Sequence, residues 1–251
     1  MPPTLAELAE DTAVYLLPRR GVETIDRPGY VFEAAGHRCA VHRLRLGDVE
    51  EAVAWVRAET RRRGAGRLEW WVGWTATPPN IAERLVELGL VPDDEEPTLT
   101  GMTCETEPPA APHVDVRPIE TLEQYLAAVE VDWDVWGLGP DERADRAGRE
   151  RARFDATGSV RHFAAYEDGR AIGFGRAIDL AQGVALMGGS VLPAARNRGV
   201  YRALVHARWE HAAARRTPLL VVQAGHMSAP VLTRLGFESH GTIRLFMDCS
   251  R

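Results

Sequence analysis

The stretch VLPAARNRGVYRALVHARWEHA, residues 191–212, passes from a short apolar run through two arginines and a glycine into a helical pattern. A helix that begins near Gly199 exposes backbone N–H groups that have no partner within the helix, and its dipole places partial positive charge there. Gly199 has no Cβ to keep a phosphate away, and Arg196, Arg198 and Arg202 can supply charge-assisted contacts. The junction therefore predicts a binding site for a diphosphate.

The strand that precedes this junction contains two adjacent glycines, Gly188 and Gly189. Glycine weakens regular strand pairing and often marks a bulge. A bulge leaves strand N–H and C=O groups unpaired, so that an extended ligand can bond to them. The ligand implied by both features has a diphosphate and a thin, amide-bearing arm.

This pattern resembles the signature of the GNAT N-acetyltransferase superfamily, which is an arginine or glutamine, two residues, a glycine, one residue, and then a glycine or alanine. Residues 196–201 read Arg-Asn-Arg-Gly-Val-Tyr, and the resemblance extends over about residues 114–251, including the helix that ends in Leu-Gly-Phe at 235–237. It implies acetyl-coenzyme A as the cofactor. The cofactor-binding residues that follow from the resemblance are Gly189, Ser190 and Val191 for the pantetheine arm, Arg196, Asn197, Arg198, Gly199, Val200, Tyr201 and Arg202 for the pyrophosphate, and Ser228 nearby.

Three departures from the family pattern affect the expected chemistry. Tyr201 stands where glycine or alanine is usual, and Gly225 and Ser228 replace the usual asparagine and alanine. Leu232 occupies the position at which many family members carry a tyrosine that protonates the departing thiolate. We therefore expect no general acid from this helix, and a small gain in turnover from Leu232→Tyr.

The catalytic base and the acceptor site are less sharply indicated. His226 follows the strand at 218–224 and is the nearest titratable candidate for a base, the alternative being a surface histidine at a helix start. We expect helices around residues 122–129 and 140–153. In VDWDVWGLG, residues 131–139, which lies between them, Asp132 and Asp134 could attract a cationic amine and Trp133 and Trp136 could cover its carbon skeleton. Equally, the tryptophans could be core and the aspartates solvated.

The composition excludes several classes of protein. The chain has 251 residues, 45% of them hydrophobic, and a formal net charge of −6, which argues against nucleic-acid binding because that needs a concentrated positive surface. Its three cysteines lack metal-ligand spacing, so we expect no metal and a reducing cytoplasm. No apolar run approaches the ~20 residues of a membrane span. The oligomeric state is open, a homodimer included.

The chain divides into two halves at the proline-rich segment ETEPPAAPH, residues 105–113. Both halves end in the order strand, helix, strand, helix, strand, and LVELGL at 85–90 aligns with LTRLGF at 232–237, which indicates an internal repeat. The alternative is that such units resemble one another by physics alone. In the N-terminal half, the helix opens with LGDVEE at 46–51, whose acidic side chains would repel a diphosphate.

We therefore predict an α/β protein with a central mixed, mainly antiparallel sheet flanked by helices. A degenerate GNAT-like domain covers residues 1–110 and a catalytic domain covers residues 111–251. The expected function is acetyl transfer to the amine of a small molecule. Two alternatives stay open: a non-catalytic acyl-coenzyme A sensor, and a structural or partner-binding module.

Overall fold

The computed structural model of the protein describes residues 2–154 and 158–249. In the N-terminal half the elements are α1 (Leu5–Glu10), a 3-10 turn η1 (Thr12–Tyr15), β1 (Val22–Arg27), β2 (Tyr30–Ala35), β3 (Arg38–His42), α2 (Val49–Arg62), β4 (Arg67–Val72), α3 (Ile81–Glu87), β5 (Val91–Pro92) and β6 (Thr98–Cys104). In the C-terminal half they are β7 (Asp115–Pro118), α4 (Leu122–Val135), α5 (Pro140–Arg153), β8 (Val160–Glu167), β9 (Arg170–Asp179), β10 (Val184–Val191), η2 (Pro193–Ala195), α6 (Val200–Ala214), β11 (Leu220–Ala224), α7 (Ala229–Arg234) and β12 (Glu238–Met247).

Within these ranges the strands form one 12-stranded sheet in the order β1-β2-β3-β4-β12-β6-β11-β10-β9-β8-β7, with β5 paired to β12. Neighbouring strands run antiparallel except in the pairs β3 with β4 and β10 with β11, which are parallel. A helix, α2 or α6, connects the two strands of each parallel pair. The predicted mixed, mainly antiparallel sheet with flanking helices is therefore confirmed.

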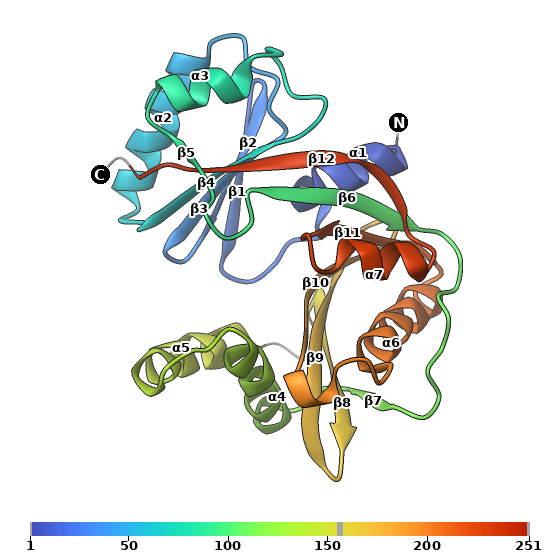
Figure 1. Ribbon diagram of the computed structural model, residues 1–251. Helices are drawn as coiled ribbons and strands as arrows, with labels where there is room; N and C mark the ends of the chain where they lie inside the picture. The colour runs from blue at the N-terminus through green and yellow to red at the C-terminus, as the bar shows by residue number, and fades with distance from the viewer. Residues whose placement is uncertain (1, 155–157, 250–251) are drawn as a thin grey trace.

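The two halves exchange their last long strands. β12, from the C-terminal half, pairs with β4, while β6, from the N-terminal half, pairs with β11, and β6 and β12 pair with each other at the centre of the sheet. Figure 1 shows β12 and β6 side by side across the middle of the molecule. The predicted boundary near residue 110 stays a prediction, but each half completes the sheet of the other.

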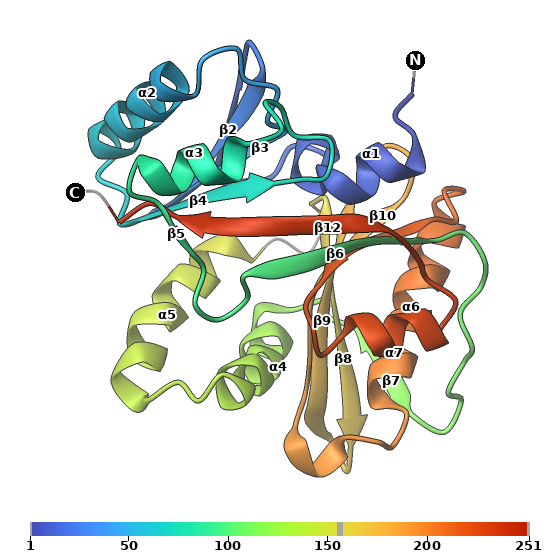
Figure 2. The ribbon, with the colours of Figure 1, turned by 45° about the horizontal axis from the view of Figure 1, so that its top comes forward.

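Helices cover both faces of the C-terminal strands. α4 and α5 lie on one side of β8–β10 and α6 on the other (Figures 1 and 2). The main core cluster of this half includes Leu204, Val205 and Trp209 of α6, and a second cluster surrounds Tyr125 and Trp133 of α4. In the N-terminal half, α2 and α3 bury their apolar faces against β2–β4.

Helix α4 is longer than the sequence indicated. The expected helix over 122–129 continues to Val135, so residues 131–135 are helical and not part of a loop between two helices. The reason is that buried residues recur at helical spacing, at Tyr125, Val129 and Trp133, beyond the expected end. The sequence analysis did not predict α1 or the hairpin formed by β1 and β2, although Thr4 and Glu7 form a capping box at the start of α1.

Candidate functional site

The parallel strands β10 and β11 diverge. They pair only at Val184 with Leu220 and at Ala185 with Val221, after which β10 follows β9 and β11 follows β6. The register of β10 against β9 shifts between Met187 and Gly189, and Gly188 has φ +64°. The predicted bulge is present, and residues 186–191 have no strand partner on the β11 side among the described residues.

A buried arginine, Arg208 of α6, holds this bulge in place. Its Nη1 donates to the carbonyl oxygens of Gly188 at 3.1 Å and Arg176 at 3.4 Å, and its Nε donates to Leu204 at 2.8 Å. Burial lowers the pKa of Arg208 to about 10. The sequence analysis missed this residue, although an arginine between the apolar positions Val205 and Trp209 on the inner face of a helix was a usable signal.

Tyr201 departs from the family pattern, and its position explains how the loop accommodates a ring. A Cβ added to Gly189 would lie only 2.7 Å from Cε2 of Tyr201, so the ring packs over the bulged strand. Burial raises the pKa of the Tyr201 hydroxyl. The glycine at 189 and the tyrosine at 201 are therefore matched in shape.

The loop before α6 has the geometry expected of an anion site. Gly199 caps the helix with φ +82°, where an L-residue is strained, and no side chain caps the first N–H groups. The predicted arginines differ in their partners: exposed Arg198 pairs with Glu167 at the end of β8, whereas Arg196 Nε donates to the carbonyl of Val191 at 3.3 Å.

Two further side chains with nitrogen atoms lie beside Gly199. Arg202 Nη2 would be 3.4 Å from a Cβ built on Gly199, and Nε of the same side chain is buried and has no hydrogen-bond partner among the described residues. His113, in the connector between the halves, places Nε2 3.1 Å from the carbonyl oxygen of Arg198 and 3.3 Å from where a Cβ on Gly199 would lie. The sequence analysis missed His113, because it is 85 residues from Arg198 and its contact depends on the path of the connector.

The segment after β11 contains the remaining predicted residues. Ser228 starts α7 and its hydroxyl donates to the carbonyl oxygen of Gly225 at 3.2 Å. His226 is exposed, and its Nδ1 lies 3.0 Å from Oε1 of Glu96. Leu232 is fully buried in the core. A tyrosine there would place its hydroxyl in the core, so we replace the expected gain from Leu232→Tyr with an expected loss of stability.

The four predicted acceptor residues do not gather on one surface. Asp132 accepts from the Ser190 hydroxyl and pairs with Arg176 Nη1 at 3.2 Å. Trp133 is buried in the core around α4. Asp134 pairs with Arg143 at 2.6 Å, and Trp136, at the end of α4, is 64% exposed. Asp134 and Trp136 are accessible, whereas Asp132 and Trp133 serve the packing of α4 onto β9 and β10.

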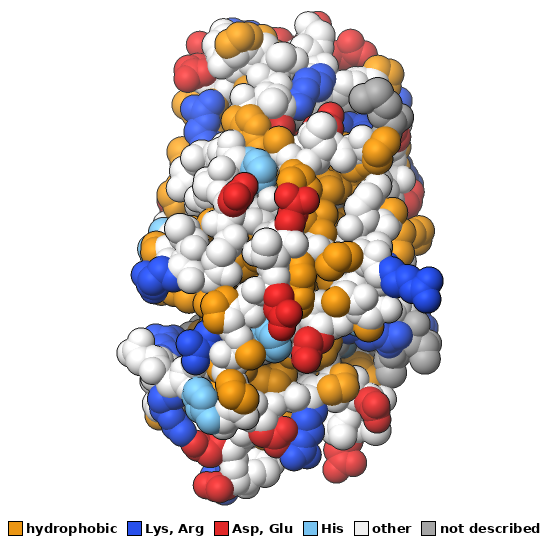
Figure 3. Space-filling view, turned by 90° about the vertical axis from the view of Figure 1, so that its right-hand side faces the viewer, with side chains coloured by type: hydrophobic (Ala, Val, Ile, Leu, Met, Phe, Trp, Pro, Cys, Tyr) orange, Lys and Arg blue, Asp and Glu red, His pale blue; other side chains and the backbone are white. Residues whose placement is uncertain are grey.

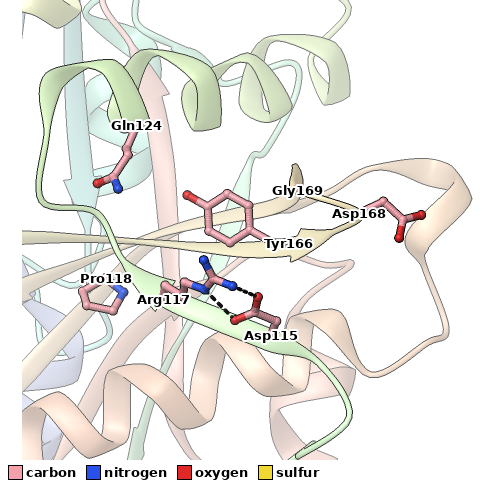
Figure 4. A pocket seen from close by; sticks show the side chains of 7 residues that line it. All are labelled: Asp115, Arg117, Pro118, Gln124, Tyr166, Asp168 and Gly169. Carbon is pink, nitrogen blue, oxygen red and sulfur yellow. Dashed lines mark hydrogen bonds and ion pairs between the residues drawn. The ribbon is translucent and has the colours of Figure 1, made fainter.

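A separate hollow of about 230 Å³ lies at the sheet edge formed by β7 and the β8–β9 turn. Its lining residues are Asp115, Arg117, Pro118, Gln124, Tyr166, Asp168 and Gly169, none of which belongs to the predicted site. Figure 4 shows the Arg117 guanidinium bonded to both carboxylate oxygens of Asp115, and its carbon lies 5.5 Å from the Tyr166 ring centroid. Arg117 is thus already paired with a carboxylate.

The distribution of charged side chains on the surface agrees with the net negative charge of the chain. On the face that carries the connector, Figure 3 shows basic, acidic and apolar side chains intermixed, with no single broad basic area. Among the residues described, no helix is both long enough and apolar enough to cross a membrane.

Comparison with known families identifies the segment that contains this site. Residues 125–237, which include β10, the loop before α6, and α7, match the family model of the acetyltransferase (GNAT) family. These residues form a GNAT domain. No curated protein sequence matches the chain.

Solved structures extend the similarity to the whole chain. A GCN5-related N-acetyltransferase from Kribbella flavida aligns with a TM-score of 0.67 at 17% identity, covering 100% of this chain and 98% of that one. A tandem GNAT protein from the clavulanic acid biosynthesis pathway aligns with a TM-score of 0.59 at 14% identity, covering 98% and 88%. A GCN5-related N-acetyltransferase from Sphaerobacter thermophilus gives 0.57 at 16% identity, covering 89% and 82%. At these identities the similarity establishes the fold, including a second, GNAT-like N-terminal half.

Proposed function

We propose that the protein is an acetyl-coenzyme A-dependent N-acetyltransferase that moves an acetyl group to the amine of a small molecule. The observation that carries the proposal is the uncapped start of α6 at Gly199, beside two strands that diverge. Membership of residues 125–237 in the GNAT family supports acetyl transfer as the reaction class.

The residues at this site fit the proposed cofactor. Arg202 Nε is a buried donor without a partner among the described residues, and Gly199 adds no Cβ beside the first N–H groups of α6, which no side chain caps. Gly189, Ser190 and Val191 offer backbone groups on the side where β10 has lost its neighbour. We propose that the loop from Arg196 to Arg202 holds the diphosphate and that the bulged strand holds the pantetheine arm. When bound, the cofactor supplies the acetyl group as a thioester.

The chain's own residues then have three tasks. Backbone N–H groups of the bulged strand polarise the acetyl carbonyl, and the diverging strands bring the amine close to it. His226 takes a proton from the acceptor ammonium, since only the neutral amine can attack. Asp134 and Trp136 are the predicted acceptor contacts that remain exposed.

Thiol release from acetyl-coenzyme A, measured with a panel of small amines, tests this function. We expect release that depends on the amine and is lost in Gly199→Asp. The buried Leu232, which has no proton to give, favours one rival, a non-catalytic acyl-coenzyme A sensor. Stabilisation by acetyl-coenzyme A without thiol release for any amine would support the sensor and overturn the proposed function.

A further inference from the structure

A glutamate of the N-terminal half reaches the end of β11 in the GNAT domain. Glu96 lies in the loop between β5 and β6, and because Thr100 of β6 pairs with Ala224 of β11, this loop runs past the end of β11. Oε1 of Glu96 accepts from the backbone N–H of His226 at 2.9 Å and lies 3.0 Å from its Nδ1. The exchange of strands thus places a carboxylate from one half on the histidine of the other.

The loop holds Glu96 in this position. Oδ1 of Asp93 accepts from the backbone N–H groups of Glu95 at 3.0 Å and Glu96 at 2.8 Å, and its other carboxylate oxygen pairs with Arg67 at 3.4 Å. Two backbone bonds and one ion pair therefore fix the start of the segment that carries the glutamate.

The glycine at 225 makes room for this contact. A Cβ built on Gly225 would collide with the carboxylate of Glu96. The asparagine that is usual at this position in the family could not be placed here without displacing Glu96. Glycine in place of asparagine at position 225 is therefore what allows the Glu96 carboxylate of the other half to lie here.

The contact has a chemical consequence for His226. A carboxylate on Nδ1 keeps the proton on that nitrogen, which leaves Nε2 as the basic atom, and it stabilises the imidazolium that forms when Nε2 takes a proton. The His226 side chain is 71% exposed and that of Glu96 31%, so an acceptor can approach Nε2. Nε2 has no hydrogen-bond partner among the residues that the structure describes.

We propose that Glu96 is a positioning residue that makes His226 the general base, so that the N-terminal half completes the active site of the C-terminal half. This inference rests on the proposed acetyl transfer. His226 Nε2 takes one proton from the acceptor ammonium. The amine nitrogen then bonds to the acetyl carbon as the carbon–sulfur bond breaks, the second amine proton goes to the sulfur, and His226 returns its proton to water.

Glu96→Gln tests the proposal in the full chain, because the amide oxygen can still accept from the His226 N–H while the charge is removed. We expect kcat to fall about 10-fold with cofactor affinity unchanged, which is less than the ~10²–10⁴-fold of general base catalysis because the histidine itself remains. Adding Glu96→Gln to His226→Ala should cause no further loss, since the glutamate acts through the histidine. Glu95→Gln, whose side chain is outside this contact, is the matched control and should behave like the parent.

NMR of the His226 ring gives a readout that does not depend on turnover. In the parent, the neutral ring should carry its proton on Nδ1, whereas in Glu96→Gln the tautomer with the proton on Nε2 should gain population, because the partner of Nδ1 has lost its charge. Equal tautomer populations in the two proteins, or losses of the two substitutions that multiply, would overturn the role of Glu96. Absence of acetyl transfer in the parent, together with an Nδ1 proton that depends on Glu96, would instead overturn the proposed function.

Discussion

Helices α2 and α6 occupy corresponding places in the two halves, each connecting the strands of a parallel pair, but they begin with opposite charge. In α2, the Asp48 carboxylate accepts from the N–H of Glu51 at 2.9 Å, and Glu50 and Glu51 add negative charge to the first turn. In α6, Gly199 leaves the first N–H groups uncapped and no acidic residue lies in the first turn. With the same topology, the first turn of α2 is therefore acidic and capped, whereas that of α6 is uncapped and has no acidic residue, and on our proposal only the second attracts an anion.

The parallel strand pairs that these helices connect also differ, because one pair stays together and the other diverges. β3 and β4 pair over four residues, from Arg38 with Arg67 to Val41 with Trp70, and a bridge between Arg45 and Thr77 keeps the chains together further on. β10 and β11 pair over two residues and then separate. In addition, the Glu10 carboxylate occupies the space over Gly73, so an extended ligand cannot lie against the backbone at that point after β4.

The largest expected effect comes from making the start of α6 resemble that of α2. Gly199→Asp puts a side chain and a negative charge into the proposed diphosphate site, so cofactor binding should collapse. At a ligand concentration of 100 times the dissociation constant, the stabilisation of about 2.7 kcal/mol should disappear from the ligand-induced thermal shift. Gly47→Asp, at a position in the N-terminal half where a Cβ meets nothing within 4 Å, should keep the full shift. A folded Gly199→Asp variant with the parent's shift would refute the placement of the site.

Each half also buries one histidine, and both should make the protein sensitive to acid. Burial lowers the pKa of His42 and of His162 to about 3. Because the unfolded chain takes up these protons near pH 6.5, stability should be lost as the pH falls from 6.5 towards 3, by about 2–3 kcal/mol for each histidine at pH 4.5.

Urea unfolding of His42→Phe and His162→Phe at pH 7 and pH 4.5 measures this loss. Each variant should lose less stability between the two pH values than the parent. Because the halves exchange strands, each substitution should shift the same single transition. A variant whose loss equals that of the parent would show that its histidine is not the source of the acid sensitivity.

Substitutions at the contact between Gly189 and Tyr201, which lies in the GNAT domain, should have a smaller effect. Gly189→Val should destabilise the protein by about 1–3 kcal/mol, because its side chain meets the tyrosine ring. In Gly189→Val with Tyr201→Ala, the combined loss should be smaller than the sum of the single losses, and denaturant titration of the four proteins measures the difference. Gly66→Val, where a Cβ meets nothing within 4 Å, is the control. Additive losses would contradict the contact.

The sequence was informative at several places where structure depends on neighbouring residues. The bulge at Gly188, the cap at Gly199 and helix α5 over 140–153 follow from local patterns, and the structure has them. The acidic residues at the start of α2 could also be predicted from the local sequence.

Long-range arrangements could not be predicted from the same patterns. The local pattern of β6 and β12 is the same whichever half completes their pairing, so the exchange left no signal. Glu96 and His113 lie far in sequence from the residues that they contact, at separations of 130 and 85 residues. The acceptor segment was misread as a loop because its aspartates hid the helical spacing that ends at Trp133.

The central claim is that only the GNAT domain binds the cofactor, and titration calorimetry with acetyl-coenzyme A tests it most directly. We predict one site per chain in the parent and in Gly47→Asp, and no measurable binding in folded Gly199→Asp, because α2 begins with acidic residues and β3 and β4 stay paired. Two sites in the parent, or one remaining site in Gly199→Asp, would contradict the account.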